Sequence, residues 1–510
     1  MEGGGTLSDL LIDANCVGCC LPAAPDAAIG GGGVSASGGA ATLTNVTVTA
    51  NVAHDGASYD GRGGGVTVVN AATLSLHTST VSDNNVFGHG GGVAVADTSA
   101  VVVTSASHVL RNVAVGCGGG IALWDSAAVT GLAVRDNAAA AIPASDSGRP
   151  HGGGGICAMS GSVSARDMTV TRNAAATSGG GATVRPFVRL TVTDSSMTEN
   201  VAGLDGGGVW VMTSADAHGD GWLVRDNVAV GSGGGIACTR CASLSRLNVT
   251  ANVAAFGGGL AFENAPSAST PTVAGHVFTD ANVATVSGGG AFLHRHARVH
   301  LSTSTLSGNV ATVFGGGVYA LDSTLGHGEQ VLVEGNSATN GAGLALNSSV
   351  VLRADDSVAS EIVVRGNTAQ QNGGGVHMST SWQRPCSIAH AGIHDNAAAS
   401  ATGGGGGMYV GSVSSPGAMP PAWVNHTVIS TCTATNGAGL FIAGVATTMG
   451  EVSVRSTLAN TNGGGVMAMD ANIVAESCSF TATNALHGGA LYVQDSSFVA
   501  IDTAATSTAA

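Results

Sequence analysis

Short strand-like segments, either apolar throughout or alternating between apolar and polar residues, recur along the whole chain. One set follows runs of glycine, as in IAL at 121–123, VWV at 209–211 and LYV at 491–493. A second set lies upstream of such runs, as in LSLHTSTV at 74–81 and HLSTSTL at 300–306. Alternation with a period of two residues is typical of β-strands with one buried face. The pattern therefore predicts an all-β fold in which each repeat holds two or three short strands joined by turns.

Runs of glycine separate the alternating segments and set the length of the repeat. The commonest spacing between successive runs is 27 residues. Glycine adopts positive φ without strain and lets neighbouring backbones approach closely, so each run indicates a tight corner between strands. Coils stacked at the ~4.8 Å spacing of paired strands would form a parallel β-solenoid of about 17 coils. The runs begin at positions 30, 63, 90, 118, 152, 179, 206, 233, 257, 288, 315, 341, 373, 403, 437, 463 and 488.

An asparagine usually precedes the glycine run by four to seven residues. Asparagine tolerates the left-handed conformation of turns, and its amide can bond to equivalent amides in the coils above and below. The alternative, that asparagine is only a common turn residue, would explain one repeat but not a dozen in register. We therefore predict a buried asparagine ladder. Its predicted members are Asn85, Asn112, Asn173, Asn200, Asn227, Asn252, Asn282, Asn309, Asn336, Asn367, Asn396 and Asn484.

A leucine-rich repeat is the main alternative architecture, because its period is 20 to 29 residues and its consensus also ends in Asn or Cys. Met168, Val170 and Asn173 match part of that consensus, and Cys432 falls where a ladder asparagine is expected. Leucine is sparse, however, and the glycine run would interrupt a helical return. The pattern favours the solenoid.

Two paired motifs resemble those of the polymorphic outer membrane proteins, which carry Gly-Gly-Ala followed by Ile, Leu or Val, and Phe-x-x-Asn. The first motif matches GGAL at 488–491, and other coils have a third glycine in place of alanine, as in GGGV at 315–318. The second motif occurs with an aliphatic residue in place of Phe, as in VRDN at 224–227 and LSGN at 306–309. The resemblance covers nearly the whole chain.

This resemblance implies a single right-handed parallel β-helix, the pectin lyase-like fold, over residues 30–500. Residues 1–29 are then expected to be an N-terminal cap or irregular lead-in, and residues 501–510 a C-terminal tail. Family members are surface-displayed passenger domains of autotransporters linked to adhesion, which favours a cell-surface or extracellular location. Residues 1–10 lack the basic and apolar regions of a signal peptide, and no apolar run is long enough to span a membrane. Two interpretations follow: an intracellular protein, or a chain whose leader and anchor lie outside this sequence.

The charge and the cysteine content of the chain limit the classes of partner and cofactor that it can bind. All 17 basic residues are arginines and the formal net charge is -15, so the basic stripe of a nucleic-acid-binding protein is missing. The acidic residues are scattered, without the clustering of a calcium loop. The cysteines of NCVGCC at 15–20 and CTRC at 238–241 suggest zinc or redox chemistry, but neither has a second pair nearby to complete four ligands. We expect no cofactor, and buried or disulfide-bonded cysteines.

Long loops that interrupt the repeat are the predicted binding sites, because solenoids usually carry function on such insertions. The loops at 52–62 and 138–151 fall in the same segment of the repeat, three coils apart. They would line a shared surface for a glycan or a surface protein; the alternative is that they are solvated insertions without function. The predicted binding residues are Tyr59, Asp60 and Arg62 in one loop and Asp146, Arg149 and His151 in the other.

A second candidate is the segment HRHARVH at 294–300, in which alternation would place His294, His296 and His300 on one strand face. Two such histidines can reach one zinc ion, but no third ligand can be assigned, so exposed histidines without metal are the preferred interpretation.

The sequence favours a non-catalytic surface or scaffold β-helix that presents loops for adhesion or for binding glycans or proteins. The alternative is a carbohydrate-active enzyme, a polysaccharide lyase or hydrolase of the same fold. Glycosidases need two carboxylates about 5 to 10 Å apart. No such pair is recognisable here, and no catalytic residue is assigned.

Overall fold

The structure is a computed structural model that contains β-strands and turns. It describes residues 5–17, 31–54, 61–103, 106–125, 127–140, 152–213, 215–241, 243–264, 272–328, 330–353, 362–381, 385–412 and 421–506. Every regular element in these ranges is a strand, and none of their residues forms a helix that could cross a membrane. The chain divides into two compact units, unit 1 (1–254) and unit 2 (255–510). Each is a right-handed parallel β-solenoid, so the predicted fold class is confirmed.

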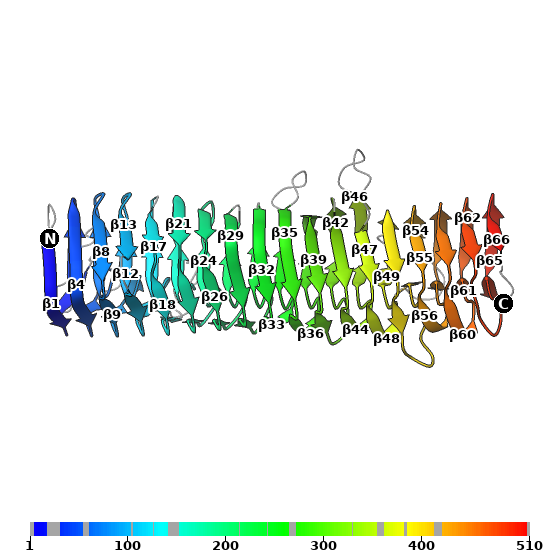
Figure 1. The fold of residues 1–510 in the computed structure, drawn as a ribbon, viewed down its shortest axis with the longest axis horizontal. Helices are drawn as coiled ribbons and strands as arrows, with labels where there is room; N and C mark the ends of the chain where they lie inside the picture. The colour runs from blue at the N-terminus through cyan, green and yellow to red at the C-terminus, as the bar shows by residue number, and fades with distance from the viewer. Residues whose placement is uncertain are drawn as a thin grey trace. The chain divides into compact units, whose positions relative to one another are not determined.

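In each unit, the strands that follow the glycine runs form a first sheet, and strands of successive coils lie side by side in it (Figure 1). Pairing is parallel and in register: Val209 aligns with Ile236, for example, and Val318 with Leu344. The first-sheet strands of unit 1 are β3 (Val34–Ser37), β7 (Val66–Val69), β12 (Val93–Val95), β16 (Ile121–Leu123), β20 (Ile156–Ala158), β24 (Ala182–Val184), β28 (Val209–Val211) and β31 (Ile236–Thr239). Those of unit 2 are β34 (Leu260–Glu263), β37 (Ala291–His294), β41 (Val318–Leu321), β45 (Leu344–Asn347), β49 (Val376–Thr380), β53 (Met408–Ser412), β57 (Leu440–Ala443), β61 (Val466–Met469) and β64 (Leu491–Gln494).

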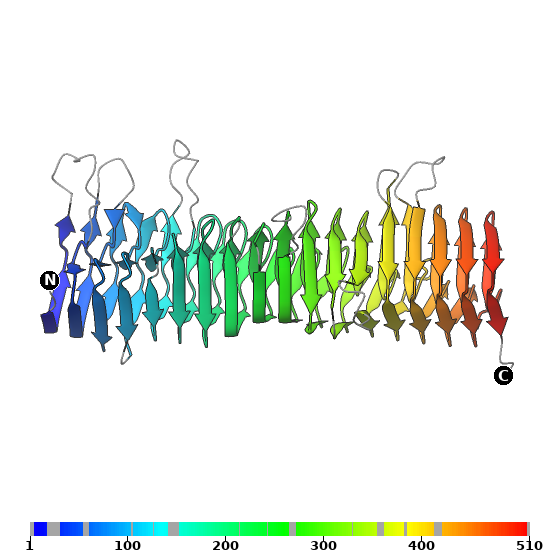
Figure 2. The same ribbon diagram turned by 90° about the horizontal axis from the view of Figure 1, so that it is seen from above.

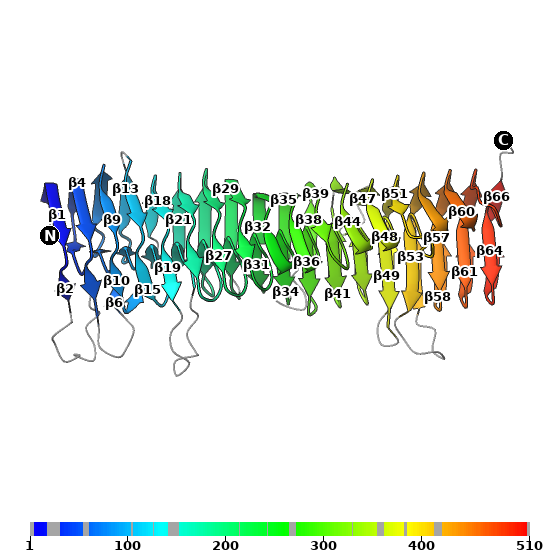
Figure 3. The same ribbon diagram turned by 90° about the horizontal axis from the view of Figure 1, so that it is seen from below.

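Two further sheets complete each coil. The second sheet holds the longer upstream strands, such as β29 (Asp216–Arg225) in unit 1 and the pair β42 (Thr324–His327) and β43 (Val331–Glu334) in unit 2. The third sheet consists of short strands such as β30 (Val228–Ala229) and β44 (Ser337–Asn340). Its strands can be followed within unit 1 in Figure 3, and the stacking of coils within each unit is visible from the opposite side in Figure 2.

The number of turns is about 15, slightly below the predicted 17. Each glycine run leads into one strand of the first sheet, but not every run corresponds to a complete turn: in the described part of the chain the coil that begins at Gly488 adds no strand to the third sheet. At the chain ends, β1 (Gly5–Asp13) pairs with β4 (Ala40–Thr49), and β66 (Ala504–Thr506) pairs with β63 (Ser479–Thr481). The described parts of the predicted lead-in and tail therefore contain paired strands.

The glycine run forms the corner before the first sheet. Gly206 has a φ of 66°, in the region that favours glycine. A Cβ on the next residue, Gly207, would collide with the carbonyl oxygen of Gly234 in the neighbouring coil. One glycine is thus required by conformation and the next by close approach of two backbones. The corner leads into a narrow core, where side chains such as Val209, Val211 and Val224 are fully buried.

The asparagine ladder is present in both units; its first member, Asn15, is exposed and donates to Asn51 Oδ1, and every later asparagine in it is at most 1% exposed. Asn200 is typical: its Nδ2 donates to Oδ1 of Asn227 (2.9 Å) and to the carbonyl oxygen of Val170 (3.0 Å). Its backbone N–H donates to the same Asn227 Oδ1 at 2.9 Å. Unit 1 contains the run Asn51, Asn84, Asn112, Asn137, Asn173, Asn200, Asn227 and Asn252. Unit 2 contains Asn282, Asn309, Asn336, Asn367 and Asn396.

Two predicted ladder positions are wrong by one residue. Asn84 rather than Asn85 donates to Asn112, because Asn85 already belongs to β10 (Asn85–Val86) of the third sheet. Asn484 aligns with Leu458, one residue beyond the ladder. At the expected position Cys432 replaces asparagine, and its thiol contacts the carbonyl oxygens of Ser430 (3.2 Å) and Ile393 (3.8 Å). A small buried donor can therefore take the place of the amide.

Candidate functional site

The described ends of the two predicted binding loops lie in one column of unit 1. Arg62 ends β6 (Gly61–Arg62), which pairs with β11 (Gly88–His89). The next coils continue the column, because Gly90 N–H donates to the Cys117 carbonyl and Cys117 bridges Gly152. The predicted residues Tyr59, Asp60, Asp146, Arg149 and His151 lie outside the described residues. Their role in binding stays a prediction.

The one predicted loop residue that is described, Arg62, packs against an aromatic ring. Its guanidinium carbon lies 4.9 Å from the ring centre of Trp124. A cation held over an indole face gains about 0.5–1 kcal/mol at an exposed site. Arg62 is thus held against Trp124.

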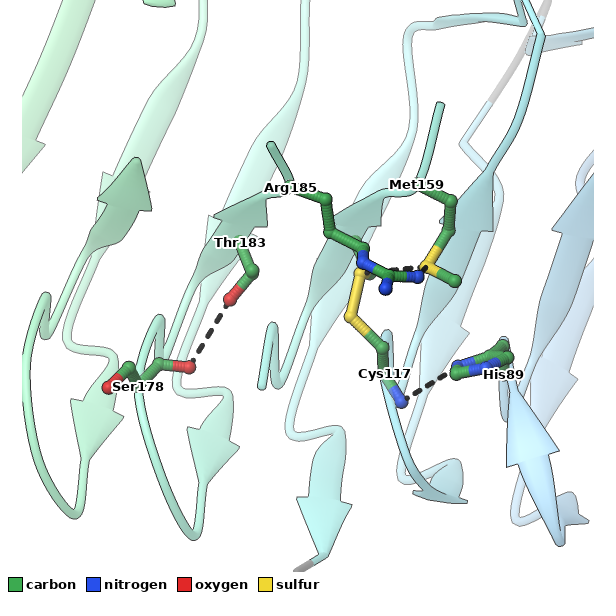
Figure 4. Close-up of a disulfide and its surroundings, with 7 residues drawn as sticks. His89, Cys117, Met159, Ser178, Thr183 and Arg185 are labelled. Carbon is green, nitrogen blue, oxygen red and sulfur yellow. Dashed lines mark hydrogen bonds between the residues drawn. A yellow bond between two sulfur atoms is a disulfide. The ribbon is translucent and has the colours of Figure 1, made fainter. Parts of the chain in front are cut away.

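A disulfide joins two neighbouring coils beside this column (Figure 4). It links Cys117 and Cys157, whose Cα atoms are 5.6 Å apart. The Cys117 N–H donates to Nδ1 of His89 at 3.2 Å, and Nη1 of Arg185 lies 3.8 Å from the sulfur of Met159. Cys117, Cys157 and Met159 are buried, so this cluster covers the outer side of the first sheet of unit 1.

A second disulfide at CTRC argues against a zinc site there and does not test redox chemistry. Cys238 and Cys241 are bonded to each other, with Cα atoms 5.5 Å apart, and are almost fully buried. A disulfide sulfur is not a thiolate ligand, so this pair does not form half of a zinc site in this state. Within the described ranges, no group of three or more His, Cys, Asp or Glu side chains is placed to hold a metal ion.

The predicted common face of three histidines is wrong. Strand β37 ends at His294, and β38 (Arg298–Ser302), which contains His300, is a separate strand of the second sheet. Between them Arg295 and His296 have φ values of 54° and 64°, so the chain turns. The apparent alternation in 294–300 combines residues of two short strands, β37 and β38, that lie on either side of a corner.

A column of aromatic rings runs over the outer side of the first sheet of unit 2. It is built from the second residue of successive strands, where in-register pairing brings equivalent side chains together. Phe292 and Tyr319 stack with ring centres 5.6 Å apart and an 18° angle between planes. His377 and Tyr409 stack at 4.9 Å and 11°, and Phe441 continues from Tyr409 at 5.5 Å.

The column is interrupted where β45 has an alanine at this position. Ala345 aligns with Tyr319 on one side and His377 on the other. Phe314, from the preceding corner, partly fills the gap: its ring centre is 5.6 Å from both neighbouring rings. It stacks on Tyr319 at 20° but meets His377 at 48°. The interruption therefore leaves a space beside His377.

A pocket of about 260 Å³ occupies this space. Its described lining combines aromatic rings, amides and hydroxyls and contains no Asp, Glu, Lys or Arg. The lining residues are Phe314, Tyr319, Asn340, Ala345, Leu346, Asn347, Gln371, Asn372, His377, Ser379, Tyr409, Gly411 and Ser412. Compact pockets of this composition bind small polar molecules that also have an apolar face.

Two of the amides that line the pocket, those of Asn340 and Asn372, belong to a second ladder, which the sequence analysis missed. Asn372 N–H donates to Asn340 Oδ1 at 3.3 Å, and Gly404 N–H donates to Asn372 Oδ1 at 3.1 Å. Further along unit 2, Asn462 Nδ2 donates to Asn436 Oδ1 at 3.2 Å. Asn340 and Asn372 are held in place by neighbouring coils, so this part of the pocket rim is preorganised.

The titratable rings of the pocket are neutral near pH 7. Burial lowers the pKa of His377 to about 4, which leaves the imidazole uncharged. Burial also raises the pKa of Tyr319 and of Tyr409, so both phenols keep their protons. The described lining thus offers hydrogen-bonding groups without net charge.

Both parts of this site had a signal in the sequence. The aromatic residues stand one residue after the first apolar residue that follows a glycine run, as in GVY at 317–319 and GMY at 407–409. The rim asparagines stand directly before the run, as in NGAG at 340–343 and NGGG at 372–375. No protein-family model, curated protein or solved structure matches the chain significantly.

Proposed function

We propose that this chain is a non-catalytic β-solenoid scaffold, displayed at a cell surface, that binds glycans through the outer face of unit 2. The observation that carries the proposal is the pocket at Ala345, where aromatic rings and preorganised amides occur together. Sugars present apolar C–H faces and a ring of hydroxyls, and these match aromatic surfaces and amide groups.

The chemistry of the pocket supports binding rather than catalysis. Hydrolysis of a glycosidic bond uses two carboxyl groups, one as the acid and one as the nucleophile or base. The described lining of the pocket offers neither. His377, with a pKa of about 4, is too weak a base to accept a proton efficiently near pH 7.

The state of the cysteines supports a location outside the reducing cytosol. Cys16 is disulfide-bonded, and the pairs Cys117–Cys157 and Cys238–Cys241 are bonded to each other. Disulfides of this kind persist in oxidising compartments. The free cysteines Cys386 and Cys432 are buried, which raises the pKa of each thiol to about 12 and makes them unreactive.

Surface display would suit an adhesive role like that of the polymorphic outer membrane proteins. Repeated coils offer several weak sites on one rigid support, and binding at several sites to one polymer raises the overall avidity. On this proposal the chain acts as a passenger-type adhesive module whose ligand is a polysaccharide.

The test is retention of the purified chain on insoluble polysaccharides, measured together with release of reducing or unsaturated ends. We expect retention without release. Tyr409→Ala should weaken retention at least tenfold, because it removes one wall of the pocket, whereas Tyr492→Ala, at the same strand position outside the pocket, should not. Release of reducing or unsaturated ends would show that the chain is an enzyme and that the scaffold proposal is wrong. Retention that depends on residues 52–62 and not on Tyr409 would move the site to the loops of unit 1.

A further inference from the structure

The interruption at Ala345 is the place in the aromatic column of unit 2 where a foreign ring can enter. Elsewhere, as between His377 and Tyr409, adjacent rings stack with nearly parallel planes and centres 4.9 Å apart. On the other side of His377, the tilted ring of Phe314 is the nearest aromatic neighbour, and the Ala345 side chain is a single methyl group. The flat side chain that would continue the stack is absent at this coil, and the pocket takes its place.

The volume limits the ligand to about one ring. Pockets for drug-sized molecules have volumes of about 300–1,000 Å³, and this one has about 260 Å³. A single six-membered sugar ring is small enough, whereas an extended oligosaccharide would have to continue along the surface.

Two polar groups in the lining have no protein partner within the described structure. The side-chain amide of Gln371, at the exposed end of β48 (Thr368–Asn372), makes no hydrogen bond to the described residues. The hydroxyl of Tyr409 makes none either. One group offers both donors and an acceptor, and the other offers a donor and an acceptor. They can bond to ligand hydroxyls without first breaking bonds within the protein.

The lack of charge sets the specificity. A carboxylate that entered the pocket would lose water without meeting a cationic side chain in the described lining, and an unpaired buried charge is strongly unfavourable. The chain also carries a net charge of -15, which repels acidic polymers. A neutral sugar buries no charge in the pocket and is not repelled by the net charge of the chain.

We infer that the pocket at Ala345 is a subsite for one neutral pyranose ring and discriminates against uronic acids. This inference rests on the proposed glycan-binding function and adds the class of sugar. The ring would lie beside His377, in the space left by the missing side chain, with its hydroxyls bonded to Gln371 and Tyr409.

The experiment measures binding of the full chain at pH 7 to single sugars by ligand-observed NMR. The probes are the methyl glycosides of glucose, mannose and galactose, and those of glucuronic and galacturonic acid. We expect at least one neutral glycoside to bind at least tenfold more tightly than either uronide. Gln371→Trp should abolish this binding by filling the pocket entrance, and Gln370→Trp, on the adjacent residue outside the pocket, should leave it unchanged. Melting temperatures of both variants equal to that of the unchanged chain will show that the fold is intact.

Two results would overturn the inference. Uronides that bind as tightly as neutral glycosides would refute the charge argument, and neutral binding that survives Gln371→Trp would place the sugar elsewhere. If the chain is retained on polysaccharides in either case, the proposed function stands and only the subsite fails. If no polysaccharide retains the chain, the proposed function fails as well.

Discussion

The two units carry different side chains at the same position, the second residue of each first-sheet strand. In unit 1 these residues are mostly small: Ser35, Thr67, Ala94, Ala122, Cys157, Thr183, Trp210 and Ala237. In unit 2 most are aromatic: Ala261, Phe292, Tyr319, Ala345, His377, Tyr409, Phe441, Met467 and Tyr492. The flanking inward residues are buried and aliphatic in both units, as Val209 and Val318 illustrate. The inward positions therefore maintain the coil, while the outward position is free to change without altering the fold.

This difference shows two ways to cover one face of a sheet. In unit 1 the small residues leave room for a covalent link, Cys117–Cys157, and for the packed side chain of Met159. In unit 2 the face is covered by rings that stack on one another, and a single alanine in that stack creates a pocket. The first arrangement strengthens the coil, and the second creates a place for a ligand.

The largest expected effect is loss of the disulfide of unit 1. A bond that closes a loop of about 40 residues contributes about 2–4 kcal/mol, mainly by restricting the unfolded chain. We expect the double variant Cys117→Ser/Cys157→Ser to lose this amount from the unfolding free energy of unit 1, measured by urea denaturation. The variant Cys386→Ser in unit 2 changes a free thiol and serves as the control for loss of a disulfide. An unfolding free energy that is the same in the double variant and in the unchanged chain would contradict a stabilising bond in unit 1.

Removing a ladder asparagine should have the next largest effect, and the same effect in both units. Asn200→Ala in unit 1 and Asn309→Ala in unit 2 each deprive a neighbouring buried amide of its acceptor. An unsatisfied buried group costs about 1–3 kcal/mol. Chemical denaturation of both variants should show this loss, and Asn484→Ala, at an exposed position beyond the ladder, should show almost none. A small loss at all three positions would mean that the ladder does not stabilise the fold.

Lowering the pH should reduce the unfolding free energy by a smaller amount, and this loss should depend on His377 in the aromatic column of unit 2. The pKa of His377 is about 4 in the folded chain, against an ordinary value of 6.5. The unfolded chain therefore binds the proton more readily, so stability is complete above pH 6.5 and falls as the pH is lowered towards 4. The difference between the two pKa values corresponds to at most about 3 kcal/mol. Because the imidazole is partly exposed to solvent, which screens its charge, we expect a loss of about 1–2 kcal/mol between pH 6.5 and 4. His377→Phe keeps the stack and should reduce this pH dependence; an unchanged dependence would contradict the role of His377.

The repeat features could be predicted from the sequence because each of them recurs at a fixed place. Glycine runs and asparagines such as Asn200 recur in register, and a residue with one physical role in every coil reveals that role by repetition. The exact ladder residue of a single coil was harder to predict. In DNN at 83–85 either asparagine fits the ladder, and only pairing of Asn85 in the third sheet leaves Asn84 for it.

The candidate site was harder to predict, because it arises from an exception to the repeat. Ala345 is unremarkable in the sequence, and it matters only because Tyr319 and His377 align on either side of it. That alignment depends on repeats of unequal length, since Tyr319 and His377 lie 26 and 32 residues from Ala345. Loop residues such as Tyr59 and Asp146 attracted attention for their chemistry, but their alignment cannot be derived from the repeat.

The most direct test of the central claim is hydrogen–deuterium exchange of the full chain with and without a soluble neutral polysaccharide, using glucan, mannan and galactan in turn. If the pocket of unit 2 is the glycan site, at least one polymer should slow exchange in residues 340–347, 371–380 and 408–412. The corresponding strands of unit 1, at 93–95 and 121–123, should exchange at an unchanged rate. Slowed exchange confined to unit 1, or none with any of the three polymers, would contradict the account.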